Sequence, residues 1–225
     1  MYPINEGQLS VSTPYSVHCI DEAATASLVQ TLARALRAFF LEAPAPLMPN
    51  LNRSSPWPAL NLYLSLTGDL GAGKTTAVRY LLKELGYLGK VKSPTYSLCE
   101  EHRLTLAQNP SSSQRESQQT IDLYHFDFYR MQSPGEWLDA GLQEHFTLQD
   151  RPTICMVEWP ERALGTLPIM DMDIAIAHGQ DPENERARTI CFTANTPSGE
   201  RLLSYIQDKS QDTSPTSRET APKSS

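Results

Sequence analysis

The residue types most suited to chemistry lie in residues 68–75, which read GDLGAGKT and match every fixed position of the pattern G-x-x-x-x-G-K-[ST]. Glycines let backbone N–H groups curl around an anion without a side-chain clash. Lys74 is placed to reach terminal phosphates, and the Thr75 hydroxyl is placed to ligate a magnesium ion that bridges phosphate oxygens. The pattern predicts a phosphate-binding loop. The alternative, a glycine turn beside a surface lysine, is disfavoured by the elements on either side.

Those elements are a strand before the loop and a helix after it. Leucines alternate with polar or aromatic residues over 60–67, which is typical of a strand. Apolar residues recur at helical spacing over 77–85, and Gly86 is placed to end that helix. The helix would direct its N-terminus, equivalent to about +0.5 charge, at a bound phosphate.

Two carboxylates are candidates for the chemistry around the phosphates. Glu158 directly follows the apolar run 154–157, and ligands bind where such buried parallel strands end. We therefore expect Glu158 to complete the metal shell. Asp127 lies in HFDFYR (residues 125–130), on the same side of a strand as His125. Asp127 either positions a water near the metal, or pairs with Arg130, or caps the following turn.

The neighbours of these carboxylates leave several roles open. His125 is expected to be a structural neighbour of the site and not a catalyst. Trp159 is as consistent with packing as with ligand contact. The segment 93–95 (SPT) is either a switch-like loop, with the Thr95 hydroxyl near the nucleotide, or an ordinary turn.

Two roles are open for each of three arginines in the sequence. Any of them is either a phosphate or partner contact or, more often for arginine, a solvated surface residue. They are Arg162, Arg186 and Arg188.

The remaining pattern predicts an α/β, P-loop NTPase-like three-layer fold, with a mixed, mostly parallel central sheet and flanking helices. We expect one domain over residues 15–207. The irregular parts would be a flexible leader (1–14), a proline-rich loop (43–58), a polar hairpin insertion (107–119) and a disordered tail (208–225). Further expected elements are a helix opened by the N-cap Asp21, a helix over 134–146 starting at Pro134, and a last helical turn over 202–206.

Composition narrows the function classes. The chain has 225 residues, a mean hydropathy of −0.40 and a net charge of −7, which argues against broad electrostatic binding to nucleic acid. No apolar run approaches the roughly 20 residues of a membrane span, and we see no signal peptide. Four scattered cysteines fit a reducing cytoplasm, where we expect the protein to be.

Together these segments resemble the TsaE (YjeE) family of bacterial P-loop ATPases. The matching pieces are an Asp21-Glu22-x-x-Thr25 segment, GDLGAGKTT (68–76), VKSPTY (91–96), HFDFYR (125–130) and VEWP (157–160). The resemblance implies a role in making threonylcarbamoyladenosine in tRNA. The protein would act on a complex of the TsaD transferase with its TsaB partner, and on tRNA only indirectly.

The resemblance also implies roles for individual residues. Residues 71–76 (Gly71, Ala72, Gly73, Lys74, Thr75 and Thr76) would hold the phosphates of ATP, and Thr75 with Glu158 would hold Mg²⁺. Asp127 and Trp159 would be needed for activity. The segment around Glu22 would border the adenine.

Three functions are therefore weighed. The first is magnesium-dependent ATP hydrolysis by Lys74, Asp127 and Glu158, slow without partners because no arginine finger is evident. The second is a small-molecule or nucleoside kinase, although no lid segment is convincing. The third is a nucleotide-sensing module without turnover. The sequence lacks an [NT]-K-x-D guanine-reading motif, which weakly favours ATP over GTP.

Overall fold

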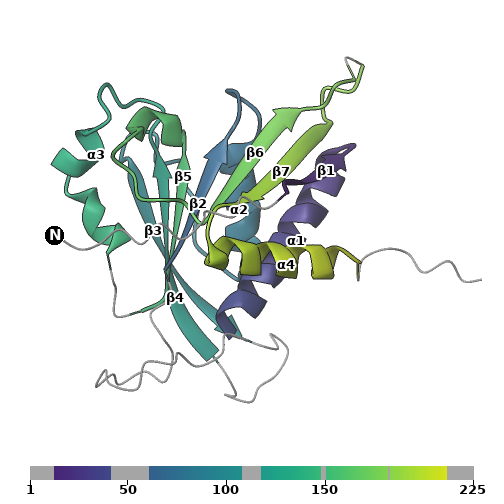
Figure 1. Cartoon of the computed structure of the whole chain (residues 1–225), viewed down its shortest axis with the longest axis horizontal. Coiled ribbons are helices and arrows are strands. Elements are labelled where there is room, and N and C mark those ends of the chain that lie inside the picture. The colour runs from purple at the N-terminus through teal and green to yellow at the C-terminus, as the bar shows by residue number, and fades with distance from the viewer. Residues whose placement is uncertain (1–12, 42–60, 108–117, 148–150, 182, 212–225) are drawn as a thin grey trace, which may run out of the picture.

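The computed structural model describes residues 13–41, 61–107, 118–147, 151–181 and 183–211 (Figure 1). The expected proline-rich loop (43–58) lies outside these residues. So do most of the expected leader (1–14) and most of the insertion (107–119). Among the helices described, none combines the length and apolar character that crossing a membrane requires.

A seven-stranded sheet, in the order β1-β7-β6-β2-β5-β4-β3, forms the centre of the described chain. The four central strands, β6, β2, β5 and β4, are parallel, whereas β1, β7 and β3 pair antiparallel at the edges. The expected mixed, mostly parallel sheet is thereby confirmed. The strands are β1 (Tyr15–Cys19), β2 (Asn61–Thr67), β3 (Cys99–Ala107), β4 (Gln118–Asp127), β5 (Thr153–Glu158), β6 (Met172–His178) and β7 (Arg188–Ala194).

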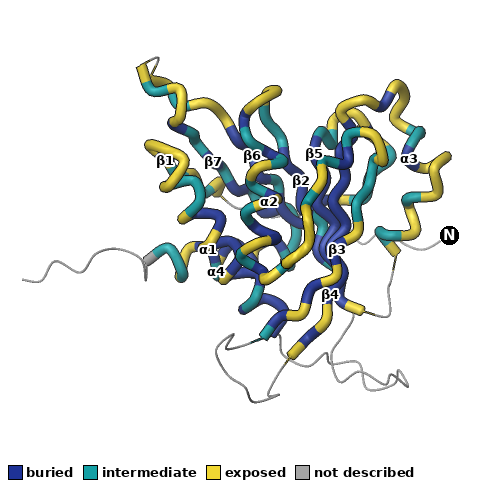
Figure 2. Tube along the Cα trace, turned by 180° about the vertical axis from the view of Figure 1, so that it is seen from behind, coloured by how far each residue is buried: buried dark blue, intermediate teal, exposed yellow. Residues whose placement is uncertain are grey.

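Helices lie on both sides of this sheet, as the expected three-layer fold requires. Figure 1 shows α3 well separated from α1, α2 and α4, which gather at the other side. The central strands are buried over most of their length (Figure 2). The helices are α1 (Glu22–Leu41), α2 (Lys74–Glu84), α3 (Glu136–Asp139) and α4 (Pro197–Gln211), with short 3₁₀ helices η1 (Leu142–Phe146) and η2 (Pro160–Ala163).

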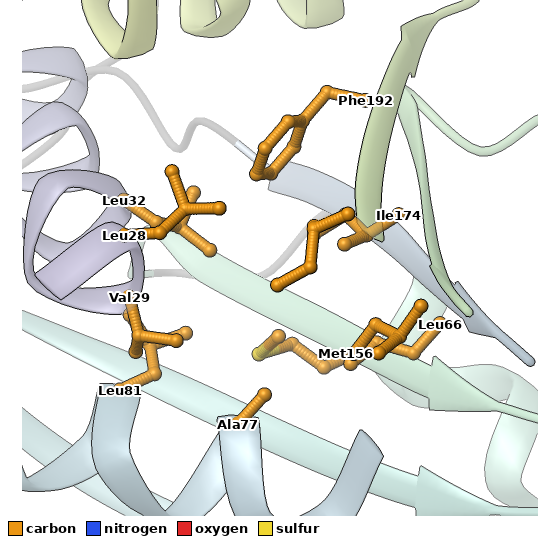
Figure 3. Close-up of a pocket in the computed structure, with 11 residues that line it drawn as sticks. Leu28, Val29, Leu32, Leu66, Ala77, Leu81, Met156, Ile174 and Phe192 are labelled. Carbon is orange, nitrogen blue, oxygen red and sulfur yellow. The ribbon is translucent and has the colours of Figure 1, made fainter. Parts of the chain in front are cut away.

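An aliphatic core joins α1 and α2 to the sheet and supports the loop that lies above it. Figure 3 shows side chains of α1 and α2 converging on Met156 of β5 and Ile174 of β6. They surround a void of about 20 Å³ whose lining is wholly apolar. This lining offers no polar atom to hydrogen-bond a water. The first helical turns of α2 therefore rest on an apolar core shared with α1 and the sheet.

Two expected helices differ from the observed ones. The helix expected over 134–146 is split into α3 and η1, because Gly141 adopts a left-handed conformation with φ 76°. The last helical turn expected over 202–206 is instead the 15-residue helix α4. Helix α4 buries Leu202, Leu203 and Ile206 in the same hydrophobic core as α1. This packing stabilises a helix that is longer than its short apolar stretch. Helix α4 runs four residues past the expected domain end at 207, and residues 212–225 of the expected tail lie outside the described chain.

Candidate nucleotide site

The phosphate-binding loop connects the end of β2 to the start of α2, as the sequence predicts. Gly68 has φ 136°, and a Cβ there would lie 2.1 Å from the carbonyl oxygen of Ile176 on β6. Gly73, the N-cap of α2, has φ 110°. Both conformations are open to glycine and strained for other residues. The loop therefore turns tightly against β6 and directs the N-terminus of α2 outward.

Lys74 is folded back onto its own loop. Its Nζ donates hydrogen bonds to the carbonyl oxygens of Gly68, at 2.6 Å, and Asp69, at 2.9 Å. The same atom lies 3.7 Å from the ring centroid of Trp159. Burial lowers the pKa of Lys74, and nearby acidic groups, Glu158 foremost, oppose that shift. Carbonyl oxygens and an aromatic face thus hold a desolvated cation that phosphate oxygens can attract.

Glu158 ends β5 immediately beside the loop. Its Oε2 accepts a hydrogen bond from the Thr75 hydroxyl at 2.9 Å, and its Oε1 lies 2.7 Å from Nε2 of His125. The Glu158 side chain is only 2% exposed. The sequence-predicted partners for a metal, Thr75 and Glu158, are therefore adjacent.

Asp127 lies directly opposite Glu158 in the β4–β5 register. Its Oδ2 accepts a hydrogen bond from the Thr95 hydroxyl at 2.7 Å, and its Oδ1 accepts one from the Tyr129 backbone N–H at 3.1 Å. Asp127 thus caps the turn after β4, which was one of the open alternatives. No ion pair joins it to Arg130 within the described residues; the Arg130 guanidinium lies over the Tyr96 ring at 4.2 Å.

Trp159 follows Glu158 in a left-handed conformation with φ 60°. This backbone turn is unusual for a bulky residue. It places the indole between Lys74 and the Tyr129 ring, whose centroid is 4.9 Å away. Trp159 therefore borders the site as well as packing beside it.

Two cavities flank the loop and share Gly71, Gly73 and Thr76. The first has a volume of about 300 Å³ and holds most of the predicted chemistry. Its side chains from the predicted set are Lys74, Thr75, Thr76, Asp127, Glu158 and Trp159, joined by Ser93, Thr95, Tyr129 and Arg130. The expectation that the Thr95 hydroxyl lies near the phosphate site therefore fits the geometry.

The second cavity, of about 240 Å³, lies on the other side of the loop. It is lined by Ala72 and by Glu22, the residue predicted to border the adenine. Glu22 thus lies in a different cavity from Asp127 and Glu158. The Tyr80 hydroxyl donates a short hydrogen bond to Glu22. This separation matches what a nucleotide needs, with its phosphates at the loop and its base to one side.

Arg188 is a neighbour of the loop whose role sequence reasoning left open. Its Nε donates to the carbonyl oxygen of Ala72 at 3.0 Å, which ties β7 to the phosphate loop. Arg186 lines the same cavity but is exposed, and Arg162 lies on the surface near Arg130. Because Arg188 and Ala72 are 116 residues apart, no local pattern indicates this contact.

The donor set fits a magnesium ion bound together with phosphate. Mg²⁺ binds through one or two carboxylates plus phosphate oxygens and waters, and here one carboxylate and one hydroxyl meet at the N-terminus of α2. Glu158 and Thr75 would hold the ion. Loop amides and Lys74 would hold phosphate oxygens.

Comparisons with known proteins identify the family of the chain. The family model "Threonylcarbamoyl adenosine biosynthesis protein TsaE" matches residues 19–189. A tRNA threonylcarbamoyladenosine biosynthesis protein TsaE from Haemophilus influenzae is 36% identical over 150 residues, covering 67% of this chain and 80% of the relative. Its counterpart from Bacillus subtilis is 36% identical over 131 residues, covering 58% and 68%.

A solved structure supports the fold. The crystal structure of Bacillus subtilis YdiB superposes with a TM-score of 0.55 at 24% identity, over 89% of this chain and 97% of that one. The family match spans β2, the phosphate loop and both carboxylate-bearing strands. The chain therefore belongs to the TsaE family.

Proposed function

We propose that this chain is a magnesium-dependent ATP hydrolase that serves threonylcarbamoyladenosine modification of tRNA by acting on a complex of TsaD and TsaB. The observation that carries the hydrolase assignment is the contact of Glu158 with Thr75 at the start of α2. It brings a metal-side carboxylate to the phosphate loop. The pathway assignment rests on the family match.

In this proposal the chain contributes charge stabilisation and positioning. Mg²⁺, when bound, would neutralise charge on the phosphate oxygens. Lys74 and the loop N–H groups would stabilise charge that develops on the transferring phosphoryl group. Asp127, in the same cavity, would orient the attacking water once its contact with Thr95 is exchanged.

Slow turnover by the isolated chain is part of the proposal. Arg130 is the arginine that lines the carboxylate-bearing cavity, and its guanidinium is stacked on the exposed Tyr96 ring. An arginine supplied to a phosphoryl transfer accelerates it by about 10³–10⁵-fold. Binding of the partner complex would bring such a group into place or rearrange this one.

The test is release of inorganic phosphate from ATP and from GTP, each with and without the TsaB–TsaD complex. We expect slow, magnesium-dependent release from ATP that the complex stimulates. Glu158→Gln should lower the rate by at least about 100-fold, since a metal ion contributes several kcal/mol to transition-state stabilisation. The exposed Glu101 on β3 supplies the control Glu101→Gln, which should behave as wild type.

Three outcomes would contradict the proposal. Equal rates of phosphate release with and without the complex would contradict the coupling of hydrolysis to TsaB–TsaD. A preference for GTP would contradict the assignment of ATP as the nucleotide. Transfer of the phosphoryl group to an added nucleoside or metabolite, in place of release to water, would indicate a kinase.

A further inference from the structure

His125 contacts the metal-side carboxylate from inside the protein. Its side chain is wholly buried, and its Nε2 lies 2.7 Å from Oε1 of Glu158. The other oxygen of Glu158 accepts from Thr75. The two carboxylate oxygens are therefore assigned to different neighbours, one to the β4 histidine and one to the phosphate loop.

We propose that His125 is a positioning residue that holds Oε1 of Glu158, so that Oε2 stays directed at the Thr75 hydroxyl and the magnesium position beside it. The inference rests on the proposed function, because it assumes a metal at Glu158. It assigns His125 no contact with nucleotide or metal.

The ladder register explains why a histidine at this position reaches Glu158. On neighbouring parallel strands, Asp127 pairs with Glu158 and His125 pairs with Met156, one step earlier along the same face. The contact between the two side chains therefore spans one step along the sheet. Together with the Thr75 contact, it restricts the rotamers open to the Glu158 carboxylate.

The hydrogen-bonding inventory of the ring supports the same role. An ionised carboxylate only accepts hydrogen bonds, so the His125 tautomer that can donate to it is the one with the proton on Nε2. Nδ1 is buried and has no hydrogen-bond partner among the described residues. Leaving a buried polar atom unpaired costs about 1–3 kcal/mol. Glu158 is thus the polar contact that accounts for a histidine at this site.

A residue that hydrogen-bonds to a metal ligand changes the metal affinity of the site without contacting the metal itself. Removal of groups that hydrogen-bond to a metal-ligating side chain typically lowers metal affinity by about 10–100-fold. The affinity for nucleotide in the absence of metal should not fall, because Lys74 and the loop amides, which would hold the phosphates, do not contact His125.

His102 provides a matched control. It is also a buried histidine, on the adjacent strand β3, and its ring packs edge-on against Tyr87 at 4.8 Å. Neither of its ring nitrogens has a hydrogen-bond partner among the described residues. Replacing His102 therefore removes a comparable buried ring without altering a contact to Glu158.

The experiment titrates Mg²⁺ into the protein–ADP complex and separately measures ADP binding in EDTA. We expect His125→Leu to raise the Mg²⁺ dissociation constant by about 10–100-fold, with ADP affinity in EDTA within about twofold of wild type. His125→Gln, whose amide can donate to Oε1 in place of the ring, should recover most of the loss. His102→Leu should match wild type.

An unchanged Mg²⁺ dissociation constant in folded His125→Leu would overturn the inference and leave the proposed function intact. Failure of the wild-type protein to bind ADP would overturn both. If His125→Leu does not fold, the wild-type protein labelled with ¹⁵N-histidine decides: the His125 Nε2–H signal should shift when Mg²⁺ joins the ADP complex. A signal that stays in place would overturn the inference.

Discussion

Two clusters of buried carboxylates lie on the same sheet but have different partners. The nucleotide cluster is formed by Lys74, Thr75, Asp127 and Glu158 at the carboxyl ends of β2, β4 and β5. The second, here called the α4 anchor, lies at the amino end of β6 and is formed by Tyr63, Ser65, Asp171, Asp173, Asn195 and Thr196.

The α4 anchor holds its carboxylates with one backbone N–H and with side chains of β2 and of the segment that leads into α4. Asp171 accepts from the Tyr63 backbone N–H at 2.8 Å and from the Thr196 hydroxyl. Gly199 packs so closely that a Cβ there would lie 1.8 Å from the Asp171 carbonyl oxygen. These contacts hold the start of α4 against the amino end of β6.

Both clusters use hydroxyl donors, but those of the nucleotide cluster line an open cavity, where a ligand can replace them. Glu158 and Asp127 accept from Thr75 and Thr95, and both pairs line an open cavity. Burial of a carboxylate thus does not distinguish function from structure. The difference lies in whether the partners can exchange for phosphate, metal or water.

The largest expected effect comes from Lys74→Ala. Loss of this cation should lower ATP hydrolysis by at least about 10²–10³-fold, the range seen when one charge-stabilising donor is removed. ADP affinity should fall as well, because no other ammonium group lines the described part of that cavity. Calorimetric ADP binding and phosphate release measure the two effects. Near wild-type affinity would contradict the assignment of Lys74 to phosphate.

Some contacts of the nucleotide cluster could be predicted from local sequence patterns, whereas others could not. The positions of Lys74 and Glu158 follow from local patterns, since a loop motif and a buried apolar run mark where parallel strands end. The pairing of His125 with Glu158 depends on the β4–β5 register across 33 residues. A slip of one residue would reverse the sides, so this contact had no local signal.

The α4 anchor was missed for a related reason. Asp171 borders an ordinary strand, and its partner Thr196 is 25 residues away. The length of α4 depends on packing against α1, which is distant in sequence. By contrast, the break at Gly141 had a visible cause in the residue itself.

Asp127→Asn tests whether the carboxylate at the end of β4 acts in turnover and not in binding. The amide can still accept from the Tyr129 N–H, so the turn should persist. We expect the turnover number to fall by about 100-fold, at the lower end for loss of a proton-handling group, while ADP affinity stays within about threefold. Parallel losses of both quantities would instead indicate a structural role.

Asp171→Ala should have the opposite profile. It leaves the partly buried Tyr63 N–H without its side-chain acceptor and removes the contact with Thr196. Leaving a buried polar group unsatisfied costs about 1–3 kcal/mol, which sets the upper range of the effect. Denaturant unfolding should show that loss of stability. The ADP affinity of the folded fraction should match wild type, and a loss of affinity comparable to that of Lys74→Ala would erase the distinction between the clusters.

The smallest effect is a pH dependence of the α4 anchor. Burial raises the pKa of Asp171 above its ordinary value of 3.8, although the hydrogen bonds from Thr196 and Tyr63 oppose the shift. Between that value and the raised one, the folded state binds the proton more tightly than the unfolded state. The free energy of unfolding contributed by Asp171 therefore falls as pH rises through this window.

Asp171→Asn cannot titrate, so the stability of the variant relative to wild type should improve from pH 4 to pH 7, by about 1.4 kcal/mol for each unit of the shift. Denaturant midpoints of both proteins across that range measure this change, and a constant difference would show that Asp171 is ionised as readily in the fold as in the unfolded chain.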